Sequence, residues 1–370
     1  QVDILNVLGA GDAFMSGFLR GYLRGESLEK SANYANASGA LVVSRHGCAP
    51  AIPGEHELLY YIENAADIVN PSTDLTLNHL HRVSFRSKEE PEIFGFAFDH
   101  RKQLVELAEN YGEDLNQIIK LKKLFIKSIT KTIEKLNIPE KNIGVLIDDT
   151  YGEDALNSIA EKSWWIGRPV ELPSSRPLKF EGDQSIGSKL QSWPLSHVVK
   201  CLIFYHPDDS DELKLKQEQK VKELYFACIQ SGHQLLLEVI PPSEYENDEA
   251  TIPTILKRFY DLKIKPDWWK LPALQDESWV QVSDVINTHD PHCQGVLLLG
   301  LSAPIDSVRE SFGVAAKYNI CKGFTVGRTI FYEPAKLWMQ HKINDHELVD
   351  SVSINYIELI QAWKKYREEI

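Results

Sequence analysis

The stretch HVVKCLIFY, residues 197–205, is a continuous apolar run interrupted by one charged residue, Lys200. Strands that are buried on both faces read as continuous apolar runs, whereas half-exposed strands alternate apolar and polar residues. The run therefore predicts a strand at the centre of a parallel sheet. A lysine inside such a strand must reach water or a polar pocket, because an unpaired buried charge costs several kcal/mol.

Similar runs lie on both sides of this one, and together they number eight. The other seven are EIFGFAF (92–98), IGVLID (143–148), WWIGRPVEL (164–172), QLLLEVI (234–240), PDWWKLPAL (266–274), QGVLLLG (294–300) and CKGFTVG (321–327). Stretches of helical period fill most connections, at 113–136, 211–231, 250–262, 274–287 and 304–318, and the third connection, around 184–192, is short. Eight strand–helix units in about 280 residues have the size of a closed (β/α)8 barrel, and they favour it over an open doubly wound sheet.

The beginning of the chain has a different pattern. NVLGAGDAFMSGF, residues 6–18, places a Gly-Ala-Gly-Asp turn before an apolar helix expected at 12–24. Such a turn at a helix N-terminus can hold phosphate. Two more helices are expected, from about Ser27 to Arg45 and at 55–64. Residues 66–91 lack strong periodicity and include the charged run RSKEEP, so we expect a linker there and the barrel domain at 92–370.

Composition excludes several classes of function. The formal net charge of −13 argues against binding to nucleic acid or to an anionic membrane. No apolar run is long enough to span a bilayer. The five cysteines show no CxxC spacing, which predicts reduced thiols in a cytoplasmic protein, and no His/Cys/carboxylate spacing indicates a metal site.

Three charged residues lie on successive strands of the expected barrel, namely Lys200, Glu238 and Lys270. Catalytic residues of such barrels lie at the carboxyl ends of the strands. Neighbouring strands are about 4.8 Å apart, so inward side chains from these three strands can meet in one pocket. A buried amine beside a second cation tends to be neutral and nucleophilic, and it can form a Schiff base with a ketone. A neighbouring carboxylate then serves as general acid and base.

Six motifs resemble the class I aldolases of the tagatose-bisphosphate aldolase type over roughly residues 92–340. They are FAFDHR, LIDDTYG, VVKCLIFYHPDD, LLLEVIPP, PDWWKLPAL and GFTVGRTIF. The resemblance implies that Lys270 forms the Schiff base, that Glu238 is the general acid/base and that Lys200 assists. It implies no cofactor and no metal, and a sugar phosphate as the small-molecule substrate. The substrate-binding residues it implies are Asp99, Arg101, Asp148, Gly300, Ser302, Gly327 and Arg328, the last four near the phosphate, although LLGLSAP (298–304) departs from the family's wording.

Residues 1–65 resemble the closing signature of ribokinase-like (PfkB) sugar kinases, in NVLGAGDAFMSGFLRGYLRG and ANYANASGALVVSRHGCAPAIP. The wording is nearest to the 5-dehydro-2-deoxygluconokinases of inositol breakdown. The resemblance implies a partial ribokinase-like α/β domain in which Asp12 is the base and the amides of Gly9, Ala10 and Gly11 form an anion hole. Asn36 would lie near the nucleotide, and the complete kinase would use ATP and Mg. We therefore expect the chain to begin in the last quarter of such a kinase.

Together the resemblances predict part of a bifunctional bacterial protein of inositol breakdown. Its kinase would make 5-dehydro-2-deoxygluconate 6-phosphate, and its barrel would cleave that product to malonate semialdehyde and dihydroxyacetone phosphate. Two alternatives stay open. In the first, the barrel is a non-catalytic module that stabilises, dimerises or regulates the kinase. In the second, it is an aldolase for another ketose phosphate. A homo-oligomer is compatible with the sequence.

Overall fold

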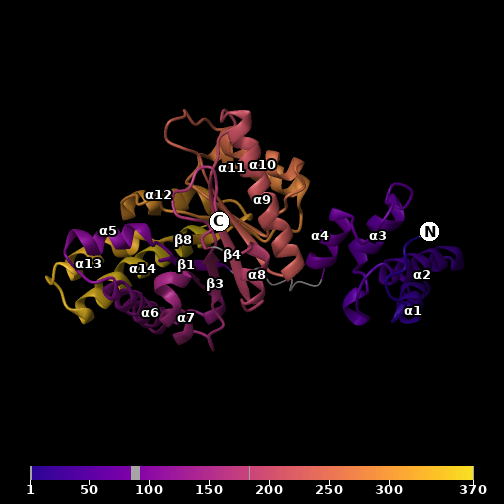
Figure 1. Cartoon of the computed structure of the whole chain (residues 1–370), viewed down its shortest axis with the longest axis horizontal. Helices are drawn as coiled ribbons and strands as arrows, with labels where there is room; N and C mark the ends of the chain where they lie inside the picture. The colour runs from indigo at the N-terminus through magenta and orange to yellow at the C-terminus, as the bar shows by residue number, and fades with distance from the viewer. Residues whose placement is uncertain (1, 85–91, 183, 370) are drawn as a thin grey trace. The chain divides into compact units, whose positions relative to one another are not determined.

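The structure is a computed structural model that describes residues 2–84, 92–182 and 184–369. The chain forms two compact units, residues 1–89 and residues 90–370 (Figure 1). The larger unit carries all the strands of the closed sheet, and each unit is described by itself below.

The larger unit is a closed barrel of eight parallel strands in the order β1 to β8. β1 pairs with β2 on one side and with β8 on the other, so the sheet has no free edge. This closure confirms the (β/α)8 barrel and excludes the open sheet. The strands are β1 Ile93–Ala97, β2 Ile143–Leu146, β3 Trp165–Pro169, β4 His197–Phe204, β5 Gln234–Ile240, β6 Trp268–Leu271, β7 Gly295–Leu298 and β8 Cys321–Val326.

Helices surround the strands of the barrel (Figure 1). Among the described residues, the connection after β3 contains the short helix α8, in the region where the sequence indicated a short connection. The helices of this unit are α5 Lys102–Asn110, α6 Asn116–Leu136, α7 Asp149–Ser158, α8 Ile186–Gln191, α9 Asp211–Ser231, α10 Thr251–Asp261, α11 Asp276–His289, α12 Ile305–Ala315, α13 Arg328–Met339 and α14 Asp345–Glu368, with a 3-10 turn η2 at Glu140–Asn142.

The barrel has two apolar cores. The larger core lies between the strands and the helices. The smaller core is built from alternate strand residues that share the inner face, and it is made of Ile93, Ala97, Leu146, Val198, Leu236, Trp268 and Leu297 with Trp165 packed against it. Trp165 and Trp268 meet edge to face, with ring centroids 5.9 Å apart. Gly167 gives the inner core room, because a Cβ there would lie 2.4 Å from Leu146 Cδ2.

The register of the strands places the charged residues directly beyond this inner core. Lys200 follows Val198, Glu238 follows Leu236 and Lys270 follows Trp268, in each case two residues later on the same strand. Because strand side chains alternate between faces, each of these charged residues shares the inner face with the apolar residue before it. The inner core therefore forms an apolar layer next to the three charged residues, which we call the floor of the site.

The smaller unit is helical in its described residues, 2–84. Its helices are α1 Ala10–Leu23, α2 Leu28–Val43, α3 Glu55–Asn64 and α4 Leu75–Val83, with a 3-10 turn η1 at Ala49–Ala51. The N-cap of α1 is Gly9, whose φ of 81° is left-handed. The Ser27 side chain caps α2 by accepting a hydrogen bond from the Lys30 amide.

Helix α4 corrects the expectation that residues 66–91 are a linker. Asp74 caps this helix by accepting a hydrogen bond from the Leu77 amide at 2.8 Å. Leu77 is fully buried in a cluster with Tyr34 of α2 and Leu58 and Tyr61 of α3. The linker expectation failed because this helix is short and its burial depends on contacts with residues far away in the sequence. The part of the segment at 85–91 lies outside the described residues.

Candidate active site

A cavity of about 220 Å³ lies at the carboxyl ends of the barrel strands. Its acidic side chains follow β1 and β3 or lie on β5, and its basic side chains lie on β4 and β6 or follow β1 and β8. Of the residues expected in the site, the cavity is lined by Lys200, Glu238, Lys270, Asp99, Arg101, Gly300, Ser302, Gly327 and Arg328. The structure thus brings together nine residues that the sequence had separated by up to 229 positions, from Asp99 to Arg328.

Lys200 is enclosed by carboxylates. Its Nζ lies 2.7 Å from Glu171 Oε1, 3.0 Å from Glu238 Oε2 and 3.1 Å from Asp99 Oδ2. The lysine side chain is 5% exposed, so these contacts are screened little by water. An ammonium group has three N–H donors, and here each can meet a separate carboxylate. Lys200 is therefore held as a fixed cation.

Lys270 has a different environment. Its Nζ lies 3.1 Å from Glu238 Oε1, and no second ion pair is found for it among the described residues. The side chain is 6% exposed and lines the cavity. Glu238 therefore connects the two lysines, with one oxygen on each amine. The amine that is less constrained is the one on β6.

Charge attraction outweighs burial at this site. Burial alone would lower the pKa of the Lys200 amine, but the carboxylates of Asp99, Glu171 and Glu238 raise that pKa well above its usual value. Burial would likewise raise the pKa of Glu238, and Lys200 and Lys270 lower it instead. The pKa of Asp99 is lowered against its burial, chiefly by Lys200. Lys200, Asp99 and Glu238 are consequently all charged at neutral pH.

His100 is the neutral member of the lining. Burial, reinforced by the cations of Arg328, Lys270 and Lys200, lowers its pKa to about 3, although Asp99 opposes the shift. Its Nδ1 is buried and has no hydrogen-bond partner among the described residues. The ring packs edge to face on Phe331, with centroids 5.5 Å apart. The imidazole is therefore an uncharged group in a cavity of charges.

Glu171 was missed in the sequence. It lies two residues beyond the end of β3, is 4% exposed and supplies the shortest contact to Lys200. Arg101 donates to the Glu171 carbonyl oxygen at 3.2 Å and to Glu181 Oε2 at 2.5 Å. The sequence had suggested one carboxylate between two lysines, whereas the structure has three carboxylates around one of them. The second oxygen of Glu171, Oε2, has no partner among the described residues.

Asp148 does not line the cavity. Its carboxylate forms a fully buried ion pair with Lys122 of α6, and it caps α7 by accepting from the Tyr151 amide at 2.8 Å. Lys122 Nζ also donates to the carbonyl oxygens of Phe98, at 2.8 Å, and His100, at 3.3 Å. Lys122, paired with Asp148, therefore fixes the backbone on both sides of Asp99.

The β7 and β8 turns complete the rim of the cavity. Leu301 and Ser302 have left-handed φ angles of 46° and 63°. Gly327 packs closely on β1, because a Cβ there would lie 2.3 Å from the Ala97 carbonyl oxygen. Arg328 begins α13 and forms no ion pair with the described residues. Burial lowers its pKa, and the more distant carboxylates of Glu238 and Asp99 oppose this.

The residues of the Gly-Ala-Gly-Asp turn lie at the start of α1 in the smaller unit. Gly9 is the N-cap, Ala10 and Gly11 open the helix, and Asp12 lies in its first turn with an exposed side chain. Asn36 is exposed in the middle of α2. The described residues of this unit contain no strand to continue into the turn.

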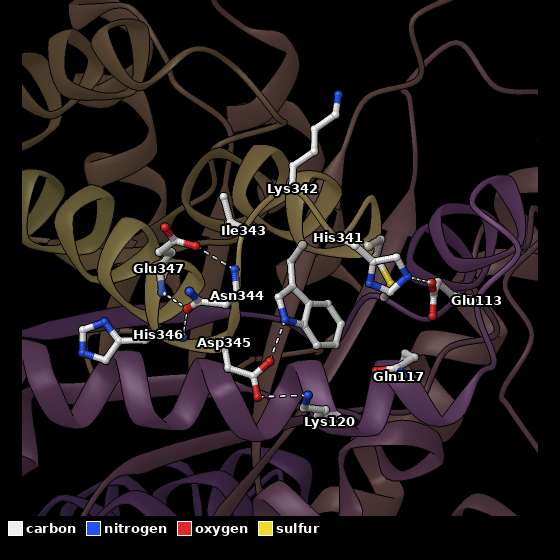
Figure 2. A pocket seen from close by; sticks show the side chains of 12 residues that line it. Glu113, Gln117, Lys120, His341, Lys342, Ile343, Asn344, Asp345, His346 and Glu347 are labelled. Carbon is white, nitrogen blue, oxygen red and sulfur yellow. Dashed lines mark hydrogen bonds and ion pairs between the residues drawn. The ribbon is translucent and has the colours of Figure 1, made fainter.

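A larger hollow lies outside the strand ends. It measures about 770 Å³ and is formed by the start of α6 and the α13–α14 connection (Figure 2). Figure 2 shows His341 facing Glu113, with Nε2 and Oε1 2.7 Å apart, and Asp345 joined to Lys120 at 2.9 Å. It contains none of the residues expected in the site, and no strand residue is part of its lining. We therefore place the candidate active site in the smaller cavity.

The described residues contain neither a metal-binding cluster nor a helix suited to cross a membrane. No group of three or more His, Cys, Asp or Glu side chains is arranged to hold a metal ion. None of the helices in the described ranges has the length and apolar character needed to cross a membrane.

Residues 57–367 match the model of a family whose description reads "Uncharacterized protein conserved in bacteria (DUF2090)". The chain belongs to the DUF2090 family. Residues 1–54 of this DUF2090 protein match a second model, described as pfkB family carbohydrate kinase. The DUF2090 match covers the whole set of strands, and the kinase match covers α1, α2 and η1.

The kinase match extends to individual proteins. The DUF2090 protein is 32% identical over 69 residues to a 5-dehydro-2-deoxygluconokinase of Bacillus thuringiensis (strain Al Hakam), covering 19% of its own chain and 21% of the kinase. It is also 32% identical over 69 residues to a 5-dehydro-2-deoxygluconokinase of Bacillus cereus (strain 03BB102), with the same coverage. The chain thus spans about a fifth of the length of the curated relatives it matches. These matches confirm a PfkB kinase fragment at the N-terminus.

The barrel of the DUF2090 protein resembles a solved aldolase in fold. The similar structure is a fructose-bisphosphate aldolase from Plasmodium falciparum, in complex with TRAP and a small-molecule inhibitor. The two superpose with a TM-score of 0.57 and 10% sequence identity, over 79% of this chain and 95% of the aldolase. At this identity the likeness establishes the shared barrel fold alone.

Proposed function

We propose that the barrel is a class I aldolase that cleaves a ketose phosphate through a Schiff base on Lys270. One observation carries the proposal: of two buried lysines that share Glu238, Lys200 is held by three carboxylates, whereas the one ion pair of Lys270 within the described residues is with Glu238. A nucleophilic amine has to leave its ion pair and lose a proton. Lys270 meets that requirement at a smaller electrostatic cost than Lys200.

The reaction follows from the contacts of Glu238. Lys270 Nζ attacks the substrate ketone, and Glu238 passes protons so that the carbonyl oxygen leaves as water and a protonated imine remains. A base then removes the proton from the hydroxyl group on the carbon that becomes the aldehyde. The bond between that carbon and the carbon next to the imine breaks, and its electron pair moves into the imine to give an enamine. Glu238 returns a proton to the enamine carbon, and water releases the ketone product.

Lys200 supports this sequence without taking part in a bond change. Its fixed positive charge lies 3.0 Å from Glu238 Oε2, so it favours the ionised form of Glu238 between proton transfers. Asp99 and Glu171 hold Lys200 in place, and Arg101 holds the β3 loop that carries Glu171. Asp99 and Arg101 also line the cavity, and we assign them to its substrate-facing side for that reason.

We place the phosphate group of the substrate at the β7 and β8 turns. Arg328 supplies a guanidinium group without an ion-pair partner in the described residues, and its backbone amide opens α13, where the helix dipole favours an anion. Gly300 and Ser302 face the same part of the cavity, and Gly327 permits the close turn. Asp148 has no place in this proposal, because Lys122 and the start of α7 use its carboxylate.

The substrate that we propose to test first is 5-dehydro-2-deoxygluconate 6-phosphate. The support comes from the kinase fragment, whose relatives are named as 5-dehydro-2-deoxygluconokinases. A complete kinase of that kind, with ATP and Mg, would supply this ketone to the barrel. Cleavage would give malonate semialdehyde and dihydroxyacetone phosphate. In this view the two units belong to consecutive steps of bacterial inositol breakdown.

The test is chemical trapping of the imine. The protein is incubated with sodium borohydride and either dihydroxyacetone phosphate or the proposed substrate, and its peptides are analysed by mass spectrometry. We expect a stable adduct on the peptide that contains Lys270, no adduct in Lys270→Met, and an adduct that persists in Lys200→Met at reduced yield. An adduct on Lys200 reverses the assignment. Absence of any adduct with a panel of ketose phosphates supports the non-catalytic alternative, and an adduct with another ketose phosphate alone changes the substrate.

A further inference from the structure

Thr325 carries a buried hydroxyl group on the inner face of the barrel, and this hydroxyl has no hydrogen-bond partner among the described residues. It lies on β8, is 1% exposed and lines the cavity. Its Oγ1 is buried and makes no hydrogen bond to any residue that the structure describes. A buried hydroxyl left unpaired costs about 1–3 kcal/mol, so such groups are nearly always satisfied. The hydroxyl therefore points to a ligand.

The packing of Thr325 fixes its orientation. It pairs in register with Gly95 of β1. A Cβ on Gly95 would lie 2.4 Å from Thr325 Cγ2, so the threonine methyl fills the space above this glycine. Threonine has few rotamers because it branches at Cβ. With the methyl held against β1, the hydroxyl is directed to another part of the barrel interior.

The rest of the lining shows which ligand group fits. Lys200, Lys270, Asp99, Glu171 and Glu238 are charged groups engaged with one another. The other hydroxyls of the lining, Ser174 and Ser302, lie in loops and have left-handed φ angles. Thr325 lies on a strand, deeper in the barrel than these loops. A neutral hydroxyl that can both donate and accept suits a ligand hydroxyl more closely than it suits a phosphate or a carboxylate.

We propose that Thr325 is a specificity-determining residue that binds the hydroxyl group on the carbon next to the substrate carbonyl. This rests on the proposed function, because the imine on Lys270 brings that carbon into the same 220 Å³ cavity. Loss of the ligand hydroxyl leaves Thr325 Oγ1 unpaired in a buried site, and this penalty discriminates against deoxy ketones. The ligand class is therefore an α-hydroxyketone phosphate.

Two ketone phosphates that differ by a single hydroxyl test the proposal. Dihydroxyacetone phosphate carries the hydroxyl, and hydroxyacetone phosphate lacks it. The half-saturating concentration for borohydride trapping is measured for both on the full chain. We expect the natural protein to prefer dihydroxyacetone phosphate by about tenfold. Equal half-saturating concentrations overturn the proposal.

Matched variants assign the preference to one atom. Thr325→Val replaces the hydroxyl by a methyl of similar size, and we expect it to abolish the preference while trapping continues. Thr325→Ser keeps the hydroxyl and is expected to retain the preference. A preference that is unchanged in Thr325→Val overturns the proposal, as does its loss in Thr325→Ser. If Thr325→Val does not fold, Thr325→Ala serves the same purpose. Absence of trapping with both ketones on the natural protein instead refutes the Schiff-base function itself.

Discussion

Glu238 Oε1 lies 3.1 Å from Lys270 Nζ, and it is the single carboxylate oxygen within ion-pair distance of that amine in the described part of the chain. The same carboxylate reaches Lys200 through its other oxygen at 3.0 Å. A proton can therefore pass between Glu238 and Lys270 without rearrangement of the strands. Lys200 meanwhile keeps the carboxylate in position.

Glu238→Gln is expected to separate imine formation from turnover. The amide keeps the shape of the side chain but cannot transfer a proton, so turnover of the ketose phosphate should fall by about 10²–10⁴. Borohydride trapping on Lys270 should remain detectable. Glu212→Gln, on the exposed surface of α9, is the matched control and should leave turnover unchanged. Near-normal turnover in Glu238→Gln removes the acid/base role.

Cleavage is expected to survive chelation of divalent metals. The protonated imine withdraws the electron pair of the breaking bond, which is the task a zinc ion performs in the other class of aldolase. Turnover is measured before and after extensive dialysis against EDTA, with a zinc-dependent aldolase treated in parallel. Loss of turnover that zinc restores contradicts the Schiff-base mechanism.

Lys122→Met is expected to destabilise the barrel by about 3–5 kcal/mol, because it leaves the fully buried Asp148 carboxylate without its cation. The double variant Lys122→Met/Asp148→Asn removes the stranded charge and should recover part of that loss. Unfolding in urea is followed by tryptophan fluorescence, since all 8 tryptophans lie in the barrel unit.

The neighbouring lysine provides the control for this variant. Lys123 pairs with Asp154 at 2.9 Å, and both side chains are about half exposed. Exposed pairs contribute little, so Lys123→Met should cost less than about 1 kcal/mol. Equal effects at the two positions would show that the Lys122–Asp148 pair is not a buried charge pair in solution.

Barrel stability is expected to fall as the pH drops from about 6.5 to 5. Burial lowers the pKa of His233, of His100 to about 3 and of His197 to about 4. A histidine whose folded pKa lies below its unfolded pKa takes up its proton on unfolding, so the stability it contributes is present above about 6.5 and lost toward the folded value. A fully buried histidine contributes a slope of up to about 1.4 kcal/mol per pH unit, and the partly exposed His197 and His233 contribute less.

His100→Asn checks this assignment. It should reduce the slope of the unfolding free energy between pH 6.5 and 5, whereas His346→Asn, whose side chain is 81% exposed, should not. The carboxylates Asp99 and Glu238 have lowered pKa values, so the stability they contribute is lost only as the pH falls below about 4. An unchanged slope in His100→Asn means that this imidazole is protonated in the folded barrel.

The smaller unit is expected not to transfer phosphoryl groups in this 370-residue chain. Transfer requires nucleotide and sugar to be held in line, and the described residues 2–84 offer four α-helices without a strand to fix the turn at Gly9. ATP hydrolysis dependent on 5-dehydro-2-deoxygluconate should therefore stay at background. Strong hydrolysis that Asp12→Asn removes would contradict this.

Several features of the barrel could be predicted because burial on both faces leaves a direct record in the sequence. Lys200, Glu238 and Lys270 interrupt continuous apolar runs, and the two-residue alternation of a strand carries each of them to the inner face. The same alternation, counted from Trp165 through Gly167, would have reached Glu171. Arg168, the other charged residue of that run, lies on the outer face, where its guanidinium donates to Asp149.

The position of Asp148 could not be predicted from its own surroundings. Alternation along β2 favours the inner face, but the partner that decides its direction is Lys122, which lies 26 residues earlier on another element. Lys122 reads as one of several lysines on an amphipathic helix, and nothing local distinguishes it from the exposed Lys123. Helix α4 was not predicted for the same reason, since its burial depends on contacts with the distant residues Tyr34 and Leu58.

Trp165 and Trp268 meet edge to face and close the barrel interior on one side of the charged residues. The cavity at the carboxyl ends of the strands is the opening on the other side. On the proposed mechanism, the substrate and the water that is released and consumed at the imine reach Lys270 and Glu238 from the carboxyl ends of the strands. Water and substrate thus share one passage.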